Sequence, residues 1–140
     1  MIREAAYNDC SGIAKICEYD LGYKCDEAFV KKQLTALDEK RECVFVAVCD
    51  NTVVGFIHVE KYEVLYYHPM ANILGLAVSS EYRRRGIGRA LLNKAEEWAK
   101  SRSISLMRLN SGSSRKEAHT FYRNAGYNEE KEQIRFLKRF

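Results

Sequence analysis

Long apolar runs and proline are scarce in this chain of 140 residues, which contains one proline. No apolar run approaches the ~18 residues that a membrane-spanning helix needs, so we expect no membrane partner. The first ten residues, MIREAAYNDC, become charged and polar within four positions, which is not the pattern of a secretory signal. We therefore expect a cytoplasmic protein. The length fits a single domain with one core, spanning residues 1–140.

The spacing of metal ligands is also missing. The five cysteines form no C-x-x-C pair, and the three histidines are scattered along the chain. We expect no metal site. The cysteines are better explained as buried, reduced thiols than as disulfides, and they are Cys10, Cys17, Cys25, Cys43 and Cys49.

A strong net charge is the third absence, because 23 basic and 19 acidic residues leave a formal net charge of +4. A nucleic-acid-binding protein usually has a denser basic face, so we expect no nucleic-acid partner. The positive excess is concentrated at one place, since four arginines there equal the whole net excess: Arg83, Arg84, Arg85 and Arg89. This local concentration is more informative than the total.

The hydrophobic pattern changes period repeatedly, which is typical of a mixed α/β domain. Helices are predicted over about residues 9–19, 26–37, 87–100 and 114–126, and strands over about 1–6, 43–50, 52–62, 71–80 and 105–112. Asn8 or Asp9 is the predicted cap of the first helix and Asp26 that of the second, and the strands on either side of Asp50 and Asn51 are predicted to form a hairpin. The tail, YNEEKEQIRFLKRF, has room for one strand or two short ones, and the pattern leaves both open. We expect an α/β (α+β) fold with helices packed on a mixed sheet.

The arginines and two glycines lie where an apolar strand meets a helix, in the segment EYRRRGIG. The first amide N–H groups of a helix lack intrahelical partners and lie at the positive end of its dipole, so they attract anions. Gly86 and Gly88 remove side chains where a phosphate would approach the backbone. The alternative is a solvated arginine cluster, but positive charge at a helix N-terminus is unfavourable unless an anion offsets it. We therefore predict a pyrophosphate site.

The sequence Arg83-x-x-Gly86-x-Gly88 resembles the R/Q-x-x-G-x-G/A signature of the GNAT superfamily of N-acetyltransferases. The preceding ILGLAVSSEY and the later AHTFYRNAGY resemble the family's central cofactor strand and its tyrosine helix, so the resemblance covers nearly the whole chain. It implies the GNAT fold, with a central sheet of six to seven strands flanked by four helices. It also implies transfer of the acetyl group of acetyl-CoA to a primary amine by direct attack in a ternary complex.

The resemblance further implies which residues bind acetyl-CoA. Backbone N–H groups at the corner would hold the pyrophosphate, and the pantetheine arm would pair with the strand before it. The matching positions are Leu76, Ala77, Val78, Arg83, Arg84, Arg85, Gly86, Ile87, Gly88 and Arg89. Arg115 stands where many family members have asparagine, and an arginine there can reach a cofactor phosphate or an anionic substrate group. A plain surface position is the alternative for Arg115.

Tyr122 matches the position of the family's usual general acid. A phenol has a reference pKa of about 10 and keeps its proton at neutral pH; a core tyrosine is the alternative. Family members with a carboxylate base on the central strand carry it where this chain has Asn72, which cannot take a proton. Glu60, Glu63 and His68 remain as candidates, and Glu60 is our first choice, acting through a water chain.

The acceptor pocket is predicted from residues that attract ammonium groups: Tyr23, Glu63, Tyr66 and His68. They favour a small amine, aminoglycoside-like or polyamine-like, or a peptide amine, and the sequence does not choose between these. A non-catalytic acetyl-CoA-binding sensor module with the same fold is the alternative function. Homodimers are frequent in the family, so the resemblance suggests a homodimer by analogy only.

Overall fold

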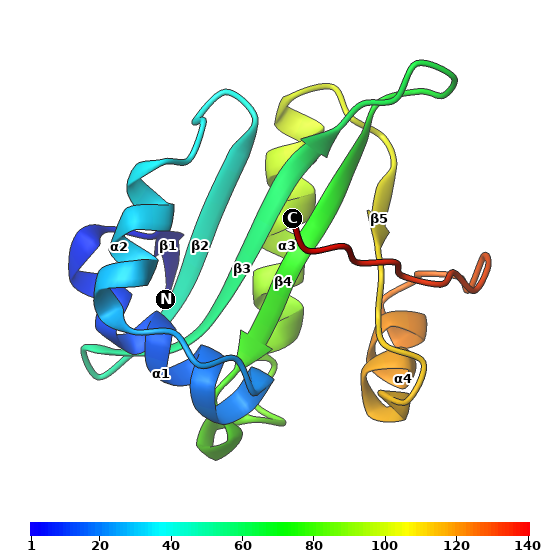
Figure 1. Cartoon of the computed structure of the whole chain (residues 1–140). Helices are drawn as coiled ribbons and strands as arrows, with labels where there is room; N and C mark the ends of the chain where they lie inside the picture. Colours follow the sequence, from blue (N-terminus) through cyan, green and yellow to red (C-terminus); the bar gives the residue numbers. More distant parts are fainter. The chain divides into compact units, whose positions relative to one another are not determined.

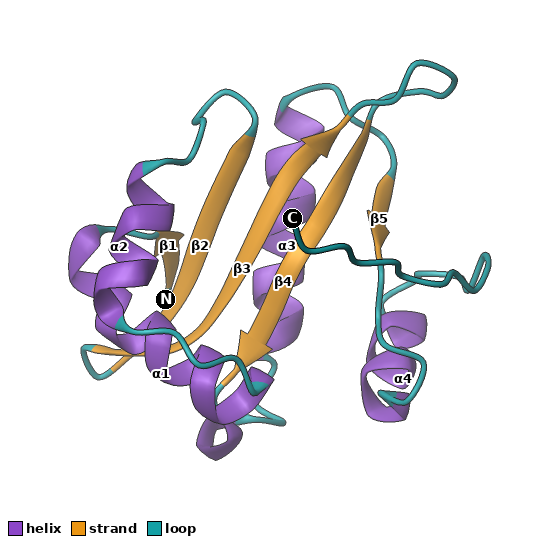
Figure 2. Cartoon of the chain, in the orientation of Figure 1, coloured by secondary structure: helices purple, strands orange, loops and turns teal.

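The computed structural model describes residues 1–140 and divides the chain into two compact units, Met1–Leu109 and Asn110–Phe140. Figure 1 colours the chain by sequence and Figure 2 by secondary structure. The first unit contains five strands, β1 (Ile2–Glu4), β2 (Glu42–Cys49), β3 (Thr52–Tyr62), β4 (Met70–Val78) and β5 (Met107–Leu109). It also contains three α-helices, α1 (Cys10–Leu21), α2 (Glu27–Thr35) and α3 (Ile87–Ser101), and the second unit contains α4 (Lys116–Asn124).

The strands form one mixed sheet in the order β1-β2-β3-β4-β5. The first three pairings are antiparallel and the β4–β5 pairing is parallel, so the prediction of a mixed sheet is confirmed. The apolar strand β4 lies between β3 and β5, as its composition predicts. None of the helices is both long enough and apolar enough to cross a bilayer.

The predicted number of strands, six to seven, is too high, because the sheet has five. The difference lies in the tail, where residues 127–140 form neither of the two predicted arrangements of strands. Its large apolar side chains are 71–113% exposed, and they are Ile134, Phe136, Leu137 and Phe140. A strand is stabilised by pairing and packing against neighbours, and an alternating sequence alone does not supply that contact.

Helices cover both faces of the sheet in the first unit (Figure 1). On one face, α1 contributes Ile13 and Ile16 to a buried cluster with Val46, Phe56 and Ala77. On the other face, α3 buries an apolar stripe, consisting of Leu91, Leu92, Ala95, Trp98 and Ala99. Gly55 of β3 permits the close approach of α3, because an added Cβ there would lie 3.1 Å from Cδ1 of Leu91.

The structure confirms a predicted hairpin and a predicted helix cap. The predicted hairpin between β2 and β3 turns at Asp50 and Asn51, whose φ angles of 49° and 62° are the left-handed values that tight hairpins require. The predicted cap of the second helix is also confirmed, since the Asp26 side chain accepts a 2.8 Å hydrogen bond from the Phe29 N–H.

Asp9 precedes α1 as predicted, but its side chain does not cap that helix. The carboxylate instead accepts two hydrogen bonds from the Arg3 guanidinium, at 2.7 and 2.9 Å, and one from the Ala6 N–H at 2.7 Å. The Asp9 side chain is only 4% exposed, so the pairing with Arg3 satisfies a buried charge. This contact ties β1 to the start of α1.

Candidate functional site

The candidate site begins where β4 and β5 separate. Their ladder has three pairs and ends at Ile73 opposite Leu109. Beyond Ile73, β4 continues to Val78 with β3 on one side and no paired strand on the other. The two ribbons diverge toward the C-terminal end of β4 (Figure 1). The backbone of residues 74–78 therefore forms an unpaired edge inside the sheet.

A β-bulge lies at the point of separation. On β3, Val59 pairs with Ile73 and the preceding His58 pairs with Gly75, which leaves Leu74 as an extra residue in β4. A bulge bends its strand and increases the local twist, so it turns β4 away from the direction of β5. The position of the bulge explains why the ladder with β5 stops at Ile73.

The unpaired edge contains the three positions predicted to line the pantetheine arm. Ala77 is 7% exposed and packs in the core cluster, while Leu76 and Val78 are half-buried. The Ala77 side chain is thus part of the core, while the backbone of all three residues lies along the unpaired edge.

The corner at the start of α3 has an unusual backbone conformation. Gly86 caps the helix with φ at 80°, and Arg84 also has a left-handed φ of 61°. The first bond that closes the helix runs from the Ala90 N–H to the Gly86 carbonyl, at 3.0 Å, so the amides of Ile87 and Gly88 precede it. A Cβ added at Gly86 would meet no atom within 4 Å. The corner therefore has open space in front of a helix N-terminus.

Arg83 is held by the body of the protein. Its Nη2 lies 3.4 Å from Oδ1 of Asp20, and its Nε donates to the Val78 carbonyl at 3.3 Å. The Asp20 side chain is only 8% exposed, and the same oxygen accepts a 3.0 Å bond from the Ser80 N–H. Asp20 thus holds residues 80–83, which connect β4 with the corner, through these two hydrogen bonds. Sequence reasoning missed Asp20, because nothing local connects it with residues 80–83.

The other corner arginines point in different directions. The Arg85 guanidinium lies over the Tyr82 ring at 4.9 Å, and the Arg89 Nε lies 3.3 Å from Oδ1 of Asn93. Arg84 makes no hydrogen bond or ion pair, and it is exposed. A non-glycine residue at positive φ costs on the order of 1–3 kcal/mol, so the left-handed conformation of Arg84 is a local strain at this corner.

Glu60, the predicted base, belongs to a polar row that crosses four strands. Its register partners are Glu42 on β2 and Asn72 on β4, and Asn72 is in turn opposite Arg108 on β5. Asn72 Nδ2 donates to Oε2 of Glu60 at 2.7 Å, and Arg108 Nη1 donates to Oδ1 of Asn72 at 2.8 Å. The sequence suggested Glu60 as the base, but it did not indicate the contacts among Glu60, Asn72 and Arg108. These contacts depend on the register of the strands, which is set by the folded sheet.

Two further contacts flank this row. His58 Nε2 lies 2.9 Å from Oε1 of Glu42, which gives that carboxylate its own partner. The Arg108 guanidinium stacks over the Tyr62 ring at 4.3 Å. The two carboxylates that stand opposite each other across β2 and β3 are thus each hydrogen-bonded to a different side chain.

The predicted acceptor residues are exposed, and three of them share the loop between β3 and β4, while Tyr23 lies in the loop after α1. Glu63 forms an ion pair with Arg41 at 3.0 Å. Tyr66 is 85% exposed and Tyr23 is 61% exposed. His68 lies in the same loop as Tyr66 and packs edge-to-face on Tyr67, with ring centroids 5.6 Å apart. No hydrogen bond connects these side chains with Glu60.

Tyr122 lies in α4 of the second unit. Burial raises the pKa of its phenol, and the nearby Arg115 charge lowers it by less. The phenol therefore holds its proton at neutral pH, as a general acid must. Arg115 is exposed and caps α4, and the ring of His119 is anchored by a 2.9 Å contact between its Nε2 and the Gly112 carbonyl.

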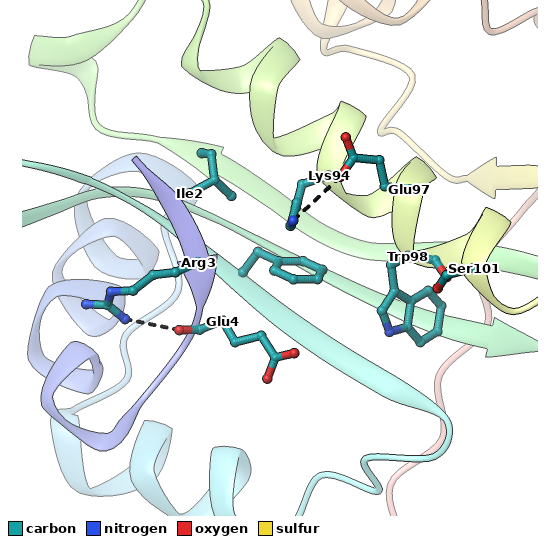
Figure 3. A pocket seen from close by; sticks show the side chains of 8 residues that line it. Ile2, Arg3, Glu4, Lys94, Glu97, Trp98 and Ser101 are labelled. Atoms are coloured by element: carbon teal, nitrogen blue, oxygen red, sulfur yellow. Dashed lines mark hydrogen bonds and ion pairs between the residues drawn. The ribbon is translucent and has the colours of Figure 1, made fainter.

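A cavity of about 380 Å³ lies elsewhere in the first unit, between β1, β2 and the C-terminal half of α3 (Figure 3). Its helical residues begin at Lys94, seven positions after the first residue of α3, which corresponds to roughly 10 Å along the helix axis. Lys94 is paired with Glu97 at 3.5 Å. This cavity is separate from the corner and from the edge of β4.

Comparisons with known proteins agree with this geometry. The model of the Acetyltransferase (GNAT) family matches residues 6–127. An uncharacterized N-acetyltransferase from Chlorobaculum tepidum is 33% identical over 131 residues, which cover 91% of this chain and 75% of that protein. The chain therefore belongs to the GNAT family of acetyltransferases.

Solved structures confirm the predicted GNAT fold. A transcriptional regulator from Bacillus halodurans C-125 has a TM-score of 0.87 with 25% identity, and the match covers 99% of both chains. AAC(6')-Iy, solved with the bisubstrate analog CoA-S-monomethyl-acetylneamine, has a TM-score of 0.84 with 17% identity, over 100% of this chain and 98% of that one. At this low identity, the second likeness is one of fold.

Proposed function

We propose that this protein is an acetyl-CoA-dependent N-acetyltransferase that acetylates a primary amine of a small molecule or peptide. The observation that carries the proposal is the unpaired edge of β4, residues 74–78, which is followed by the left-handed corner at Gly86. An extended arm can pair with such an edge as an added strand, and a diphosphate can accept bonds from the amides at the start of α3.

The cofactor contacts in this proposal are mostly made by the backbone. Amides of Leu76, Ala77 and Val78 pair with the arm, and one of them polarises the thioester carbonyl. Amides of residues 84–89 surround the pyrophosphate, and Arg115 neutralises a phosphate charge. AAC(6')-Iy has the same fold and was solved with a CoA-containing analog, which supports the assignment of a CoA ligand.

The proposed chemistry is direct attack. Glu60 accepts a proton from the acceptor ammonium through water, so that the neutral amine nitrogen can attack the thioester carbonyl carbon. The C–S bond then breaks, and Tyr122 donates its proton to the departing thiolate. The attacking nitrogen loses its second proton at the same time, and this proton returns the Tyr122 phenolate to the phenol, so a neutral amide and a free thiol are left. Holding both reactants in one complex supplies most of the remaining rate enhancement.

The proposed acceptor is a small molecule with several amino groups. Carboxylates line the sheet surface and the adjoining loop at Glu42, Glu60 and Glu63, and the exposed aromatic ring of Tyr66 lies nearby in sequence. Both kinds of group attract ammonium ions. The acetylneamine part of the analog in AAC(6')-Iy is consistent with an amine acceptor of this kind.

A non-catalytic acetyl-CoA sensor is the second candidate. It is favoured by the likeness to the Bacillus halodurans transcriptional regulator, which shows this fold in a protein described by a regulatory role. The two candidates share cofactor binding and differ in turnover.

The deciding experiment measures both properties. Purified protein is titrated with acetyl-CoA and then incubated with acetyl-CoA and a panel of polyamines, amino sugars and peptide amines, with thiol release and product mass as readouts. We expect turnover, and we expect Glu60→Gln to bind acetyl-CoA normally while losing most of its activity near neutral pH, where the acceptor amine is protonated and needs a base. Tight acetyl-CoA binding with no acetylated product across the panel would favour the sensor, and absence of binding would refute both.

A further inference from the structure

We propose that Asn72 and Arg108 are positioning residues that orient Glu60 for proton acceptance. The inference rests on the proposed role of Glu60 as the base. It starts from a chain of two hydrogen bonds, from Arg108 to Asn72 at 2.8 Å and from Asn72 to Glu60 at 2.7 Å. The three side chains occupy register-matched positions on β5, β4 and β3.

The ends of this chain determine which way the amide points. A guanidinium can only donate hydrogen bonds, and an ionised carboxylate can only accept them. The Asn72 oxygen must therefore face Arg108, and its NH₂ group must face Glu60. If the Asn72 amide were rotated by half a turn, it would place its oxygen against the Glu60 carboxylate and its NH₂ against the guanidinium. Arg108 thus holds the orientation that Asn72 presents to Glu60.

Burial makes this orientation stable. Asn72 is 8% exposed, so water does not readily replace either of its partners. The Arg108 guanidinium is held in turn by stacking on Tyr62 at 4.3 Å. Oε2 of Glu60 is occupied by the amide, which leaves the second carboxylate oxygen to accept a proton.

The amide also separates the positive charge from the base. An arginine in direct contact with a carboxylate strongly favours the ionised form, and this makes the carboxylate a poor proton acceptor. Here the contact to Glu60 is a neutral donor, and the charge of Arg108 lies one residue further away. The other titratable groups around Glu60 on the sheet are Glu42 and His58, which bond to each other, and Tyr62.

The hydrogen-bonded chain of Arg108, Asn72 and Glu60, called the relay below, lies next to the point where β4 loses its pairing with β5. The pair Asn72–Arg108 is the middle one of the three pairs that join β4 to β5, and β4 bulges two residues later at Leu74. The same short ladder therefore aligns the base and ends where the unpaired backbone begins. The ladder is made by the backbone and the relay by side chains, so a side-chain change in the relay should act on proton transfer and leave acetyl-CoA binding intact.

The test uses Arg108→Met, which keeps an apolar stem and removes all donors. We expect kcat to fall about 10-fold, the loss of one hydrogen bond to a charged network, with the KM for acetyl-CoA within about twofold. Arg108→Lys, which restores a donor and the charge, should recover most of the activity. Asn72→Asp, which removes the donor facing Glu60, should move the acidic limb of the kcat/KM profile to higher pH.

A matched control separates positioning from stacking. Arg102 lies over the Trp98 ring at 4.3 Å, the same separation as Arg108 from Tyr62, but it is not part of the relay. Arg102→Met should leave kcat and the pH profile unchanged. An Arg108→Met variant with the kcat and pH profile of the wild type would overturn the proposal, and so would equal losses in Arg108→Met and Arg102→Met.

A second measurement does not depend on turnover. In ¹⁵N–¹H spectra, the side-chain amide signal of Asn72 should shift with pH in the wild type, and this response should be lost in Glu60→Gln and reduced in Arg108→Met. If the wild type acetylates no amine, the proposed function fails while the spectra still decide the relay. If the chemical shift of the Asn72 side-chain amide does not change with pH in the wild type, the relay is refuted, even if the enzyme is active.

Discussion

Replacement of Gly86 by alanine isolates the contribution of the corner to cofactor binding. Gly86 has a φ of 80°, and Gly22 at the end of α1 has a nearly equal φ of 77°. An added Cβ meets no atom within 4 Å at either position. Gly86→Ala and Gly22→Ala therefore impose the same backbone strain without a steric clash, and only one of the two positions lies at the proposed phosphate site.

The expected magnitudes follow from this pairing. An alanine in the left-handed conformation lowers the free energy of unfolding by about 1–2 kcal/mol. Each kcal/mol lost lowers the Tm by roughly 2–8 °C, and both variants should show this loss. At Gly86 the added methyl group also lies in the path of a diphosphate toward the first amides of α3. The loss of one charge-assisted hydrogen bond, about 1.5–3 kcal/mol, corresponds to roughly a 10- to 150-fold weaker Kd. Gly86→Glu adds a negative charge and should weaken binding further.

Calorimetric titration with coenzyme A at constant ionic strength gives the Kd of each variant, and thermal unfolding gives the Tm. We expect Gly22→Ala to bind like the wild type and Gly86→Ala to bind at least 10-fold more weakly, with similar losses in Tm. The reasoning is refuted if Gly86→Glu keeps the wild-type Kd, or if both alanine variants lose affinity equally.

Three further predictions concern individual side chains. Tyr122→Phe should keep acetyl-CoA affinity and lower kcat at least 10-fold, as measured with any accepted amine, because it removes a phenol whose pKa burial raises. Asp9→Asn should lower the free energy of unfolding by about 2–3 kcal/mol at pH 7, because it breaks the Arg3 pair, whose arginine side chain is 40% exposed. Hydrogen bonds from Arg3 hold the pKa of Asp9 below its usual range. The difference in free energy of unfolding between the wild type and Asp9→Asn, measured with urea, should therefore have its full size above about pH 4 and shrink as the pH falls further. Burial raises the pKa of Cys43 to about 11, so peptide mapping should show slower alkylation of Cys43 than of the half-buried Cys49 near pH 7.5, and equal rates would contradict this.

Features that depend on local chemistry were predictable from the sequence. The left-handed cap at Gly86, the hairpin at Asp50 and Asn51, and the cap at Asp26 each follow from residue types that favour one backbone conformation. The central position of β4 follows from its apolar composition. These signals predicted a mixed sheet with helices packed on it, and the resemblance of three motifs to the family predicted the GNAT fold.

Features that depend on register were out of reach. The contact of Glu60 with Asn72 requires the exact pairing of β3 with β4, and the bulge at Leu74 shifts that pairing by one residue beyond His58. The clamp between Asp20 and Arg83 joins positions 63 residues apart. No local pattern specifies contacts of this kind, because they arise only when the sheet and the helices have packed together.

The bulge at Leu74 has a consequence for solubility. Unpaired main-chain groups along a strand offer a template on which another polypeptide can add, and this is a common start of aggregation. The extra residue coils β4 and makes a flat, incoming chain fit poorly along residues 74–78. One irregularity thus leaves one side of the strand unpaired while it discourages polymerisation of the protein.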